Sequence, residues 1–183
     1  GSSTAGKETA GTVTTKQVNF SRVYNDLTTV VGSNLNSTLT TSDTVGSETL
    51  TMTGSGSVAS QNFSGSAQSI TLGTLSLGNG TNGGLASNYT LSGSSLTINK
   101  RPLDIDGSKI YDGNTNAVHS ILTASNFATD STTGNSETLG LSGTATISSK
   151  DAGSRTITNA ASALTLSNGS NGGLANNYTF TGG

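Results

Sequence analysis

The fold of this chain is decided by one stretch near its middle, Lys100-Arg101-Pro102-Leu103-Asp104-Ile105-Asp106-Gly107-Ser108-Lys109-Ile110-Tyr111-Asp112-Gly113, which contains the only proline. Apolar and polar residues alternate before it, in Leu96-Thr97-Ile98, and within it, in Leu103-Asp104-Ile105. Such alternation predicts strands with one buried face. Pro102 lies between the two runs. This position is compatible with the start of a strand, where a residue without an N–H is tolerated. We therefore expect the last strand of one module to pass directly into the first strand of the next, closing on a turn at Asp112-Gly113.

The sequence on either side of this stretch consists of two copies of one pattern. Val23-Tyr24-Asn25-Asp26 aligns with Ile110-Tyr111-Asp112-Gly113, so the first copy keeps the tyrosine but lacks the Asp-Gly pair. From Ser47 onward the copies align without gaps, and equivalent residues differ by 89 in number. The closing segments agree best, as in Asn88-Tyr89-Thr90 and Asn177-Tyr178-Thr179. So long a period indicates modules that each have their own small core, rather than a solenoid of short coils.

Several motifs of the second copy resemble the YDG domain. These motifs are Ile98–Leu103, Lys109–Thr115, Leu141–Ala145, Ser149–Gly153 and Asn177–Thr179. The resemblance covers nearly all of the second copy, and a weaker form of it covers the first. YDG domains recur in large bacterial surface adhesins of the filamentous-haemagglutinin type, which are exported by two-partner secretion. The resemblance therefore implies an extracellular or cell-surface location and a role in adhesion.

The composition favours thin β modules. Ser, Thr, Asn and Gly make up more than half of the 183 residues, hydrophobic residues are 30%, and the net charge is only −2. Threonine suits strands, since its branched side chain packs well on a pleated surface. We expect an all-β fold of two tandem small β-sandwich or β-grasp-like modules in an elongated arrangement. The weak acidity gives no basic footprint for nucleic acid, and no apolar run is long enough for membrane insertion by a helix.

The repeat pattern predicts the domain boundaries. Residues 1–11 carry no periodic apolar signal and are expected to be a flexible lead-in. Module 1 spans residues 12–99, and module 2, of the YDG type, spans residues 100–183. The first copy continues past the position equivalent to Gly183, so we expect a fragment of a longer polypeptide whose second module lacks its final strand. Its partners would be neighbouring repeat modules of the same polypeptide.

Two loop features are also predicted. The Asn-Gly and Gly-Gly pairs in 79–84 and 168–173 supply positive φ for tight turns. The leucines that follow, Leu85 and Leu174, are expected to tuck these loops onto the core. The stretch Thr115–Ser136 is the one place where a short helical turn is expected.

Catalytic and metal-binding interpretations are weak. His119 is the only histidine, and no nucleophile elbow accompanies it. Glu48 and Glu137 are equivalent, but each copy has one carboxylate where a glycosidase needs two. We therefore expect both to be solvated charges at strand edges. Asp104 and Asp106 belong on the polar face of a strand rather than in a calcium loop. We expect no enzymatic activity, no cofactor and no metal site.

The recurring tyrosines predict structural rather than ligand-binding roles. Aromatic residues at equivalent positions of small modules mostly pack in cores. We expect each closing tyrosine to open a strand with its ring inward and its hydroxyl bonded to the backbone. The residues expected to form the structural motif are Tyr24, Tyr89, Pro102, Tyr111, Asp112, Gly113 and Tyr178.

Two functions follow from these observations. The first is a stalk or spacer of repeated modules in a secreted or cell-surface adhesin, supporting cell adhesion or biofilm formation. The alternative is a module that itself binds glycans of the host or matrix, through exposed aromatic residues or residues specific to one copy.

Overall fold

The computed structural model describes residues 14–38 and 44–181, so the predicted lead-in of residues 1–11 lies outside the described residues. The chain divides into two compact units. Unit 1 comprises Gly1–Arg22 and Thr28–Ile98, and unit 2 comprises Val23–Leu27 and Asn99–Gly183. Five residues that lie within the first sequence copy therefore belong to the second structural unit.

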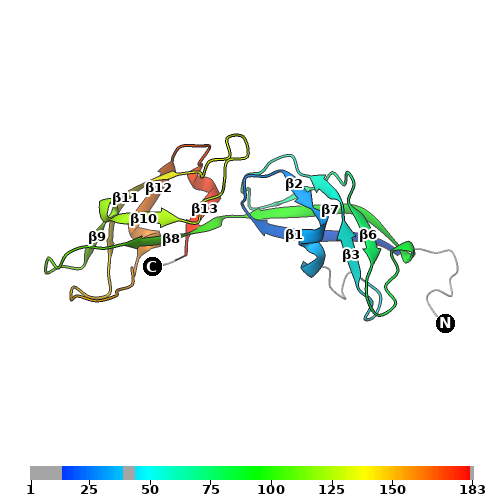
Figure 1. The fold of residues 1–183 in the computed structure, drawn as a ribbon, viewed down its shortest axis with the longest axis horizontal. Helices are drawn as coiled ribbons and strands as arrows, with labels where there is room; N and C mark the ends of the chain where they lie inside the picture. Colours follow the sequence, from blue (N-terminus) through cyan, green and yellow to red (C-terminus); the bar gives the residue numbers. More distant parts are fainter. Residues whose placement is uncertain (1–13, 39–43, 182–183) are drawn as a thin grey trace. The chain divides into compact units, whose positions relative to one another are not determined.

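Unit 1 consists of small sheets, in which β1 and β7 are long strands and the others are short (Figure 1). One sheet has the strand order β1-β7-β5, and two pairs are β2-β4 and β3-β6. The elements are β1 (Thr14–Val23), β2 (Thr29–Val31), the 3-10 helix η1 (Gly32–Thr38), β3 (Leu50–Thr53), β4 (Ser55–Ser57), β5 (Ala67–Ser69), β6 (Ser76–Asn79), the 3-10 helix η3 (Ala86–Asn88) and β7 (Tyr89–Asn99).

Unit 2 contains two three-stranded sheets, with the orders β10-β8-β13 and β12-β11-β9. Strand β8 pairs antiparallel with β10 and parallel with β13, where Pro102 lies opposite Thr179. The elements are β8 (Arg101–Gly107), β9 (Asn116–Val118), the 3-10 helix η4 (His119–Ile121), β10 (Leu122–Ser125), β11 (Leu139–Thr146), the short helix α2 (Ala160–Ala163), β12 (Leu164–Asn168), the 3-10 helix η5 (Ala175–Asn177) and β13 (Tyr178–Phe180).

One glycine in each unit sets the path of the long central strand. Strand β11 pairs with β12 as far as Gly143 and with β9 from Thr144 onward. Gly143 has φ +100°, and a Cβ there would collide with the carbonyl of Ala163. The equivalent Gly54 has φ +78° and separates β3, which pairs with β6, from β4, which pairs with β2. A left-handed glycine therefore lets one strand serve two neighbours in both repeats.

The core of unit 2 is thin, as the composition predicts. Its buried cluster consists of two branched aliphatic residues and three alanines: Ile105, Ala117, Ala145, Ala160 and Leu164. Beside these small residues, Tyr24 and Tyr178 are among the largest fully buried side chains. Unit 2 therefore depends on tyrosines for much of its buried volume.

The predicted all-β class is confirmed, as is the direct passage between copies, because only Lys100 separates β7 from β8. The helical turn predicted in Thr115–Ser136 occurs as η4. The prediction that this is the one such place is wrong, because η1, η3, α2 and η5 are short helices elsewhere in the chain. The predicted positive φ occurs at Asn82 and Asn171 and at the glycines that follow them. No helix in the described part of the chain is long and apolar enough to cross a membrane.

Two local predictions are wrong. Leu85 and Leu174 are exposed rather than tucked onto the core, because the closing loops are held by polar contacts instead. In each loop an asparagine side chain, Asn79 or Asn168, accepts a hydrogen bond from the backbone N–H of the alanine seven residues later. The predicted turn at Asp112-Gly113 does not close a hairpin: the bend lies at Gly113-Asn114, with Gly113 at φ +80°, and β9 then pairs with β11 rather than back onto β8.

Candidate functional site

A buried carboxylate lies at the centre of the best-defined polar cluster. The side chain of Glu137 is fully buried. Its Oε1 accepts a hydrogen bond from the Tyr178 hydroxyl at 2.6 Å, and its Oε2 accepts one from the Tyr24 hydroxyl at 2.7 Å. The Tyr178 hydroxyl in turn accepts the backbone N–H of Ala128 at 3.1 Å. Both carboxylate oxygens are thereby satisfied, which a buried acid requires.

Tyr24, which lies in the segment 23–27, is held in place by bonds of both its backbone and its side chain. Its N–H donates to the carbonyl of Asn99 at 2.9 Å, and its carbonyl accepts from Arg101 at 3.3 Å. The neighbouring Asp26, at φ +63°, lies 3.0 Å from the Tyr24 hydroxyl and accepts the N–H of Ser131 at 2.6 Å. The segment is therefore an integral part of unit 2.

The aromatic rings pack edge to face around the carboxylate. The centroids of Tyr24 and Tyr178 are 5.5 Å apart with an interplanar angle of 73°, and Phe127 lies 5.5 Å from Tyr178. Burial raises the pKa of both tyrosine hydroxyls, and their bonds to Glu137 raise it further. Burial also raises the pKa of the Glu137 carboxyl above its ordinary value of 4.5, with a further contribution from the nearby negative charges. The phenols therefore act as hydrogen-bond donors.

Unit 1 contains the equivalent of half of this cluster. The Tyr89 hydroxyl donates to Glu48 Oε1 at 2.7 Å and accepts the N–H of Val45 at 2.9 Å. Burial raises the pKa of Tyr89, as does its bond to Glu48. Within residues 14–38 and 44–181, Glu48 Oε2 has no hydrogen-bond partner, and Glu48 is only half-buried. The second tyrosine of the unit 2 cluster thus has no counterpart among the described residues of unit 1.

A separate open cleft of about 480 Å³ lies on unit 2. Its walls come from the loop after β8 and from the loop around residues 147–157, and its floor is apolar. Its charged lining residues are Asp106, Lys109, Lys150, Asp151 and Arg155. The exposed ring of Tyr111 also lines the cleft, 5.8 Å from the Lys150 ammonium.

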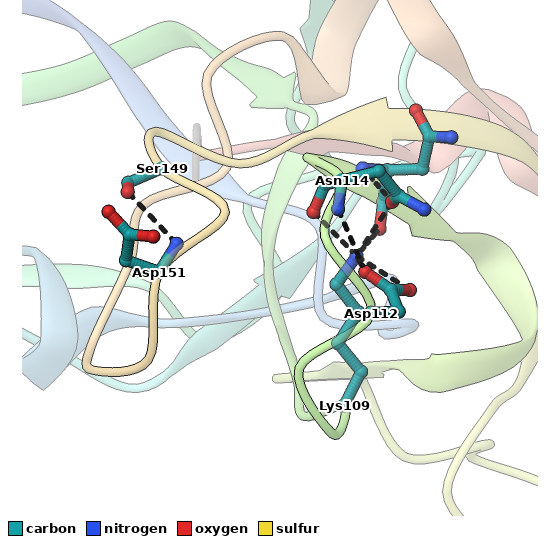
Figure 2. A network of polar contacts seen from close by, with 6 residues as sticks. Lys109, Asp112, Asn114, Ser149 and Asp151 are labelled. Carbon is teal, nitrogen blue, oxygen red and sulfur yellow. Dashed lines mark hydrogen bonds and ion pairs between the residues drawn. The ribbon is translucent and has the colours of Figure 1, made fainter.

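The lysines of the cleft are engaged by their own loops, and Figure 2 shows the contacts of Lys109. Lys109 Nζ donates to Asp112 at 2.9 Å, to the Asn114 side chain at 2.9 Å and to the Asn116 carbonyl at 2.7 Å. This contact with Lys109 lowers the pKa of Asp112. Lys150 pairs with the adjacent Asp151 at 3.1 Å. The network fixes the loop 108–116 and leaves little net charge to recognise an ionic ligand.

The structure separates the predicted motif residues into three groups. Tyr24 and Tyr178 meet at Glu137, whereas Tyr89 occupies the equivalent place in unit 1. The Pro102 carbonyl accepts from the Asn126 side chain at 2.9 Å. Tyr111, Asp112 and Gly113 are consecutive in the loop 108–115, and Tyr111 lines the cleft. Tyr178 and Tyr89 open their strands with rings inward and hydroxyls bonded to the backbone, as predicted. A core role for Tyr111 is wrong, because it is 60% exposed.

The prediction that Glu137 is a solvated edge charge is also wrong. Its recurrence at Glu48, with the same offset of 89 that relates Tyr89 to Tyr178, was the available signal. Asp104 and Asp106 are exposed on the polar face of β8, as expected. His119 is exposed, and its Nδ1 lies 3.2 Å from the Gly143 carbonyl. Among the described residues, no group of three or more His, Cys, Asp or Glu side chains could hold a metal ion.

These features define a protein of tandem β repeats: the small sheets, the Glu–Tyr pair that occurs in both units, and residues 23–27, which lie in the first repeat but belong to unit 2. The YDG domain family matches residues 7–98 and 99–183, so the chain belongs to this family and contains two tandem YDG domains. The sequence analysis predicts modules at 12–99 and 100–183. No curated protein and no solved structure is similar to the chain.

We expect Tyr24→Phe to destabilise unit 2 but not unit 1, although Tyr24 lies in the first repeat of the sequence. The substitution keeps the ring but removes a donor to a buried carboxylate, which costs about 1–3 kcal/mol. Urea unfolding followed by NMR signals assigned to each unit would measure this. Tyr111→Phe is the matched control, since the exposed ring should change stability by less than about 0.5 kcal/mol. Equal losses in both units would contradict the assignment of residues 23–27.

The raised pKa of Glu137 predicts a specific pH dependence. The folded state holds its proton at pH values where the unfolded carboxyl has lost it. The contribution of Glu137 to stability therefore falls as the pH rises from its ordinary pKa through the raised one. As the pH falls through the raised pKa toward the ordinary value of 4.5, the wild-type unit 2 should gain stability relative to Glu137→Gln. Acids that do not interact with Glu137, such as Asp112, are present in both proteins and cancel. Parallel stability curves would show that the pKa is not raised.

Proposed function

We propose that these two YDG repeats are a structural spacer in the stalk of a secreted or cell-surface bacterial adhesin of the filamentous-haemagglutinin type, exported by two-partner secretion. In this role they support cell adhesion or biofilm formation by holding a binding region away from the cell. They act without catalysis, and their partners are neighbouring repeats of the same polypeptide.

The observation that carries this proposal is the coupling between successive repeats. Unit 2 is completed by residues 23–27 of the first repeat, and a single residue, Lys100, joins β7 to β8. In linear repeat proteins, contacts between nearest neighbours add to the stability of each repeat. A link of one residue also leaves no flexible linker of the Gly/Ser type. Both features suit a polypeptide whose function is to act as a spacer.

The surface composition supports the same proposal. Charged residues are only 10% of the sequence, and hydroxyl and amide side chains replace them as the polar groups. Many of these side chains bond locally, as between Thr49 and Thr81 or between Thr138 and Ser170. Such a surface stays hydrated without a strong charge, as a spacer that has no ionic ligand requires.

The spacer role predicts that other modules can replace these repeats. Residues 12–183 would be exchanged, within the surface-displayed polypeptide that contains them, for two unrelated β modules of equal span. Adhesion measured at matched surface display should remain unchanged. A deletion of residues 12–183 is the control, because it should reduce adhesion by shortening the stalk. Adhesion lost in the exchange at equal display would instead mean that the repeats carry recognition.

A second candidate function is glycan binding, favoured by the cleft on unit 2. Exposed tyrosines stack against sugar rings, and Tyr111 lines the cleft beside apolar floor residues such as Ile147 and Ile157. Since Lys109 and Lys150 are paired with Asp112 and Asp151, a neutral sugar suits the cleft better than an acidic one.

Glycan binding at this cleft predicts a loss of affinity in Tyr111→Ala. Binding of neutral and acidic oligosaccharides to the two-repeat chain would be measured by calorimetry, with His119→Ala as an exposed control outside the cleft. Affinity for a neutral sugar should fall by about tenfold in Tyr111→Ala, which corresponds to the loss of one stacking contact of about 1.4 kcal/mol. An equal affinity in both variants would place any binding elsewhere.

A further inference from the structure

Tyr111 differs from the other three tyrosines. Tyr24, Tyr89 and Tyr178 are at most 7% exposed, whereas Tyr111 is 60% exposed and the preceding Ile110 is 90% exposed. No hydrogen bond to the Tyr111 hydroxyl occurs within the part of the chain that the structure describes. The sequence nevertheless aligns Tyr111 with the fully buried Tyr24. Equivalent residues of two repeats thus have opposite environments.

The position of the acceptor explains this difference. Tyr24 belongs to the first repeat, but its acceptor, Glu137, belongs to the second. The acceptor equivalent to Glu137 for Tyr111 would therefore belong to a third repeat. Adding the offset of 89 to Glu137 gives a position beyond residue 183, outside the sequence.

The other end of the arrangement shows the complementary feature. Glu48 and Tyr89 reproduce the Glu137–Tyr178 pair, including the backbone N–H that donates to the tyrosine hydroxyl. Glu48 lacks the second tyrosine, and the position equivalent to Tyr24 one repeat earlier falls before residue 1, since Tyr24 and Tyr111 differ by 87 in number. Glu48 is correspondingly half-buried, whereas Glu137 is fully buried.

We propose that each YDG repeat donates one tyrosine, Tyr24 in the first repeat and Tyr111 in the second, to the Glu–Tyr pair of the repeat that follows. Tyr111 is thus the donor for a further YDG repeat, and Glu48 with Tyr89 is the acceptor for a preceding one. The partner is another copy of the same module. This inference rests on the repeats themselves and not on the proposed role in adhesion.

Backbone conformation in the donor segment supports the proposal. Asp26, two residues after Tyr24, has φ +63°, and Gly113, two residues after Tyr111, has φ +80°. Both segments therefore make the same left-handed step after the tyrosine. Gly113 has no carboxylate to replace Asp26, so the tyrosine bond is retained in the proposed contact and the bond to Ser131 is not.

Strand lengths agree with the same arrangement. Strand β1 extends to Val23, and the Tyr24 N–H then bonds to Asn99, the last residue of β7. The equivalent strand β8 ends at Gly107, and β13, which ends at Phe180, pairs only with Arg101–Leu103 at the start of β8. The second part of β7 begins at Ser92, and the equivalent position, Thr181, comes directly after the last residue of β13.

A three-repeat chain tests the proposal. Phe180 is equivalent to Leu91, so residues 1–180 followed by a second copy of residues 92–183 preserve the repeat register. The third repeat's copy of Tyr111 is replaced by phenylalanine, so that only position 111 is observed. Nitration by tetranitromethane, located by mass spectrometry, then reports the exposure of Tyr111. Tyr24 is the protected control in both chains, and the third repeat's copy of Tyr178 reports whether that repeat has folded.

The expected result is that Tyr111 is nitrated at least about tenfold more slowly in the three-repeat chain than in the two-repeat chain, as for a group that reacts only after local opening. Tyr111→Phe should also destabilise the third repeat, whereas it leaves the two-repeat chain unchanged. Equal nitration of Tyr111 in both chains, with the third repeat folded, would overturn the proposal.

A third repeat that fails to fold is also informative. Residues 110–114 of the three-repeat chain would then be replaced by the sequence of Val23–Leu27, which is known to complete unit 2. The proposal is overturned if the third repeat folds only with this replacement, or if it fails to fold with either segment. In both cases 110–113 could not act as the donor. Neither result depends on adhesion, so the spacer function stands or falls separately.

Discussion

The structure of unit 2 depends on the satisfaction of one buried carboxylate. Burying an ionisable acid costs several kcal/mol unless its oxygens find donors. Glu137 has two phenolic donors, and its own N–H bonds to the Ala128 carbonyl at 2.9 Å. Since three of the five core-cluster residues are alanines, the tyrosines that serve Glu137 also fill space that the core leaves empty. Hydrogen bonding and packing therefore depend on the same side chains.

This constraint explains why the structural units do not coincide with the sequence repeats. The family matches meet between residues 98 and 99, yet residues 23–27 belong to unit 2. The segment is too short to have a core of its own. The bonds of Tyr24 to Asn99, Arg101 and Glu137 make the segment part of unit 2. A second module cut at the repeat boundary would lose one donor to its buried acid, so unit 2 includes a segment of the first repeat.

Sequence patterns predicted those features that depend on neighbouring residues. Alternation located β7 and β8, and Asn-Gly pairs located positive φ at Asn82 and Asn171. Sequence patterns failed where residues far apart in the sequence determine whether a side chain is buried. The Tyr24–Glu137 bond joins residues 113 apart, so an isolated glutamate before a strand looked solvated. The exposure of Leu85 and Leu174 was missed because asparagine side chains, and not the leucines, hold the closing loops. Equivalence between copies misled at Tyr111, since equal sequence implies equal burial only where each copy has the same neighbours.

The direction of the tyrosine contact has a consequence for assembly. In each repeat the donor tyrosine lies near the start of the sequence, whereas the glutamate and the closing tyrosine lie further along it, as Tyr24, Glu48 and Tyr89 show. A contact between two different surfaces of identical modules is heterologous, and such contacts extend without closing unless rotation returns the chain on itself. Covalent linkage of the repeats already fixes which module follows which. Within unit 2, the Tyr24–Glu137 bond and the backbone bonds of Tyr24 to Asn99 and Arg101 fix residues 23–27 against the rest of the unit.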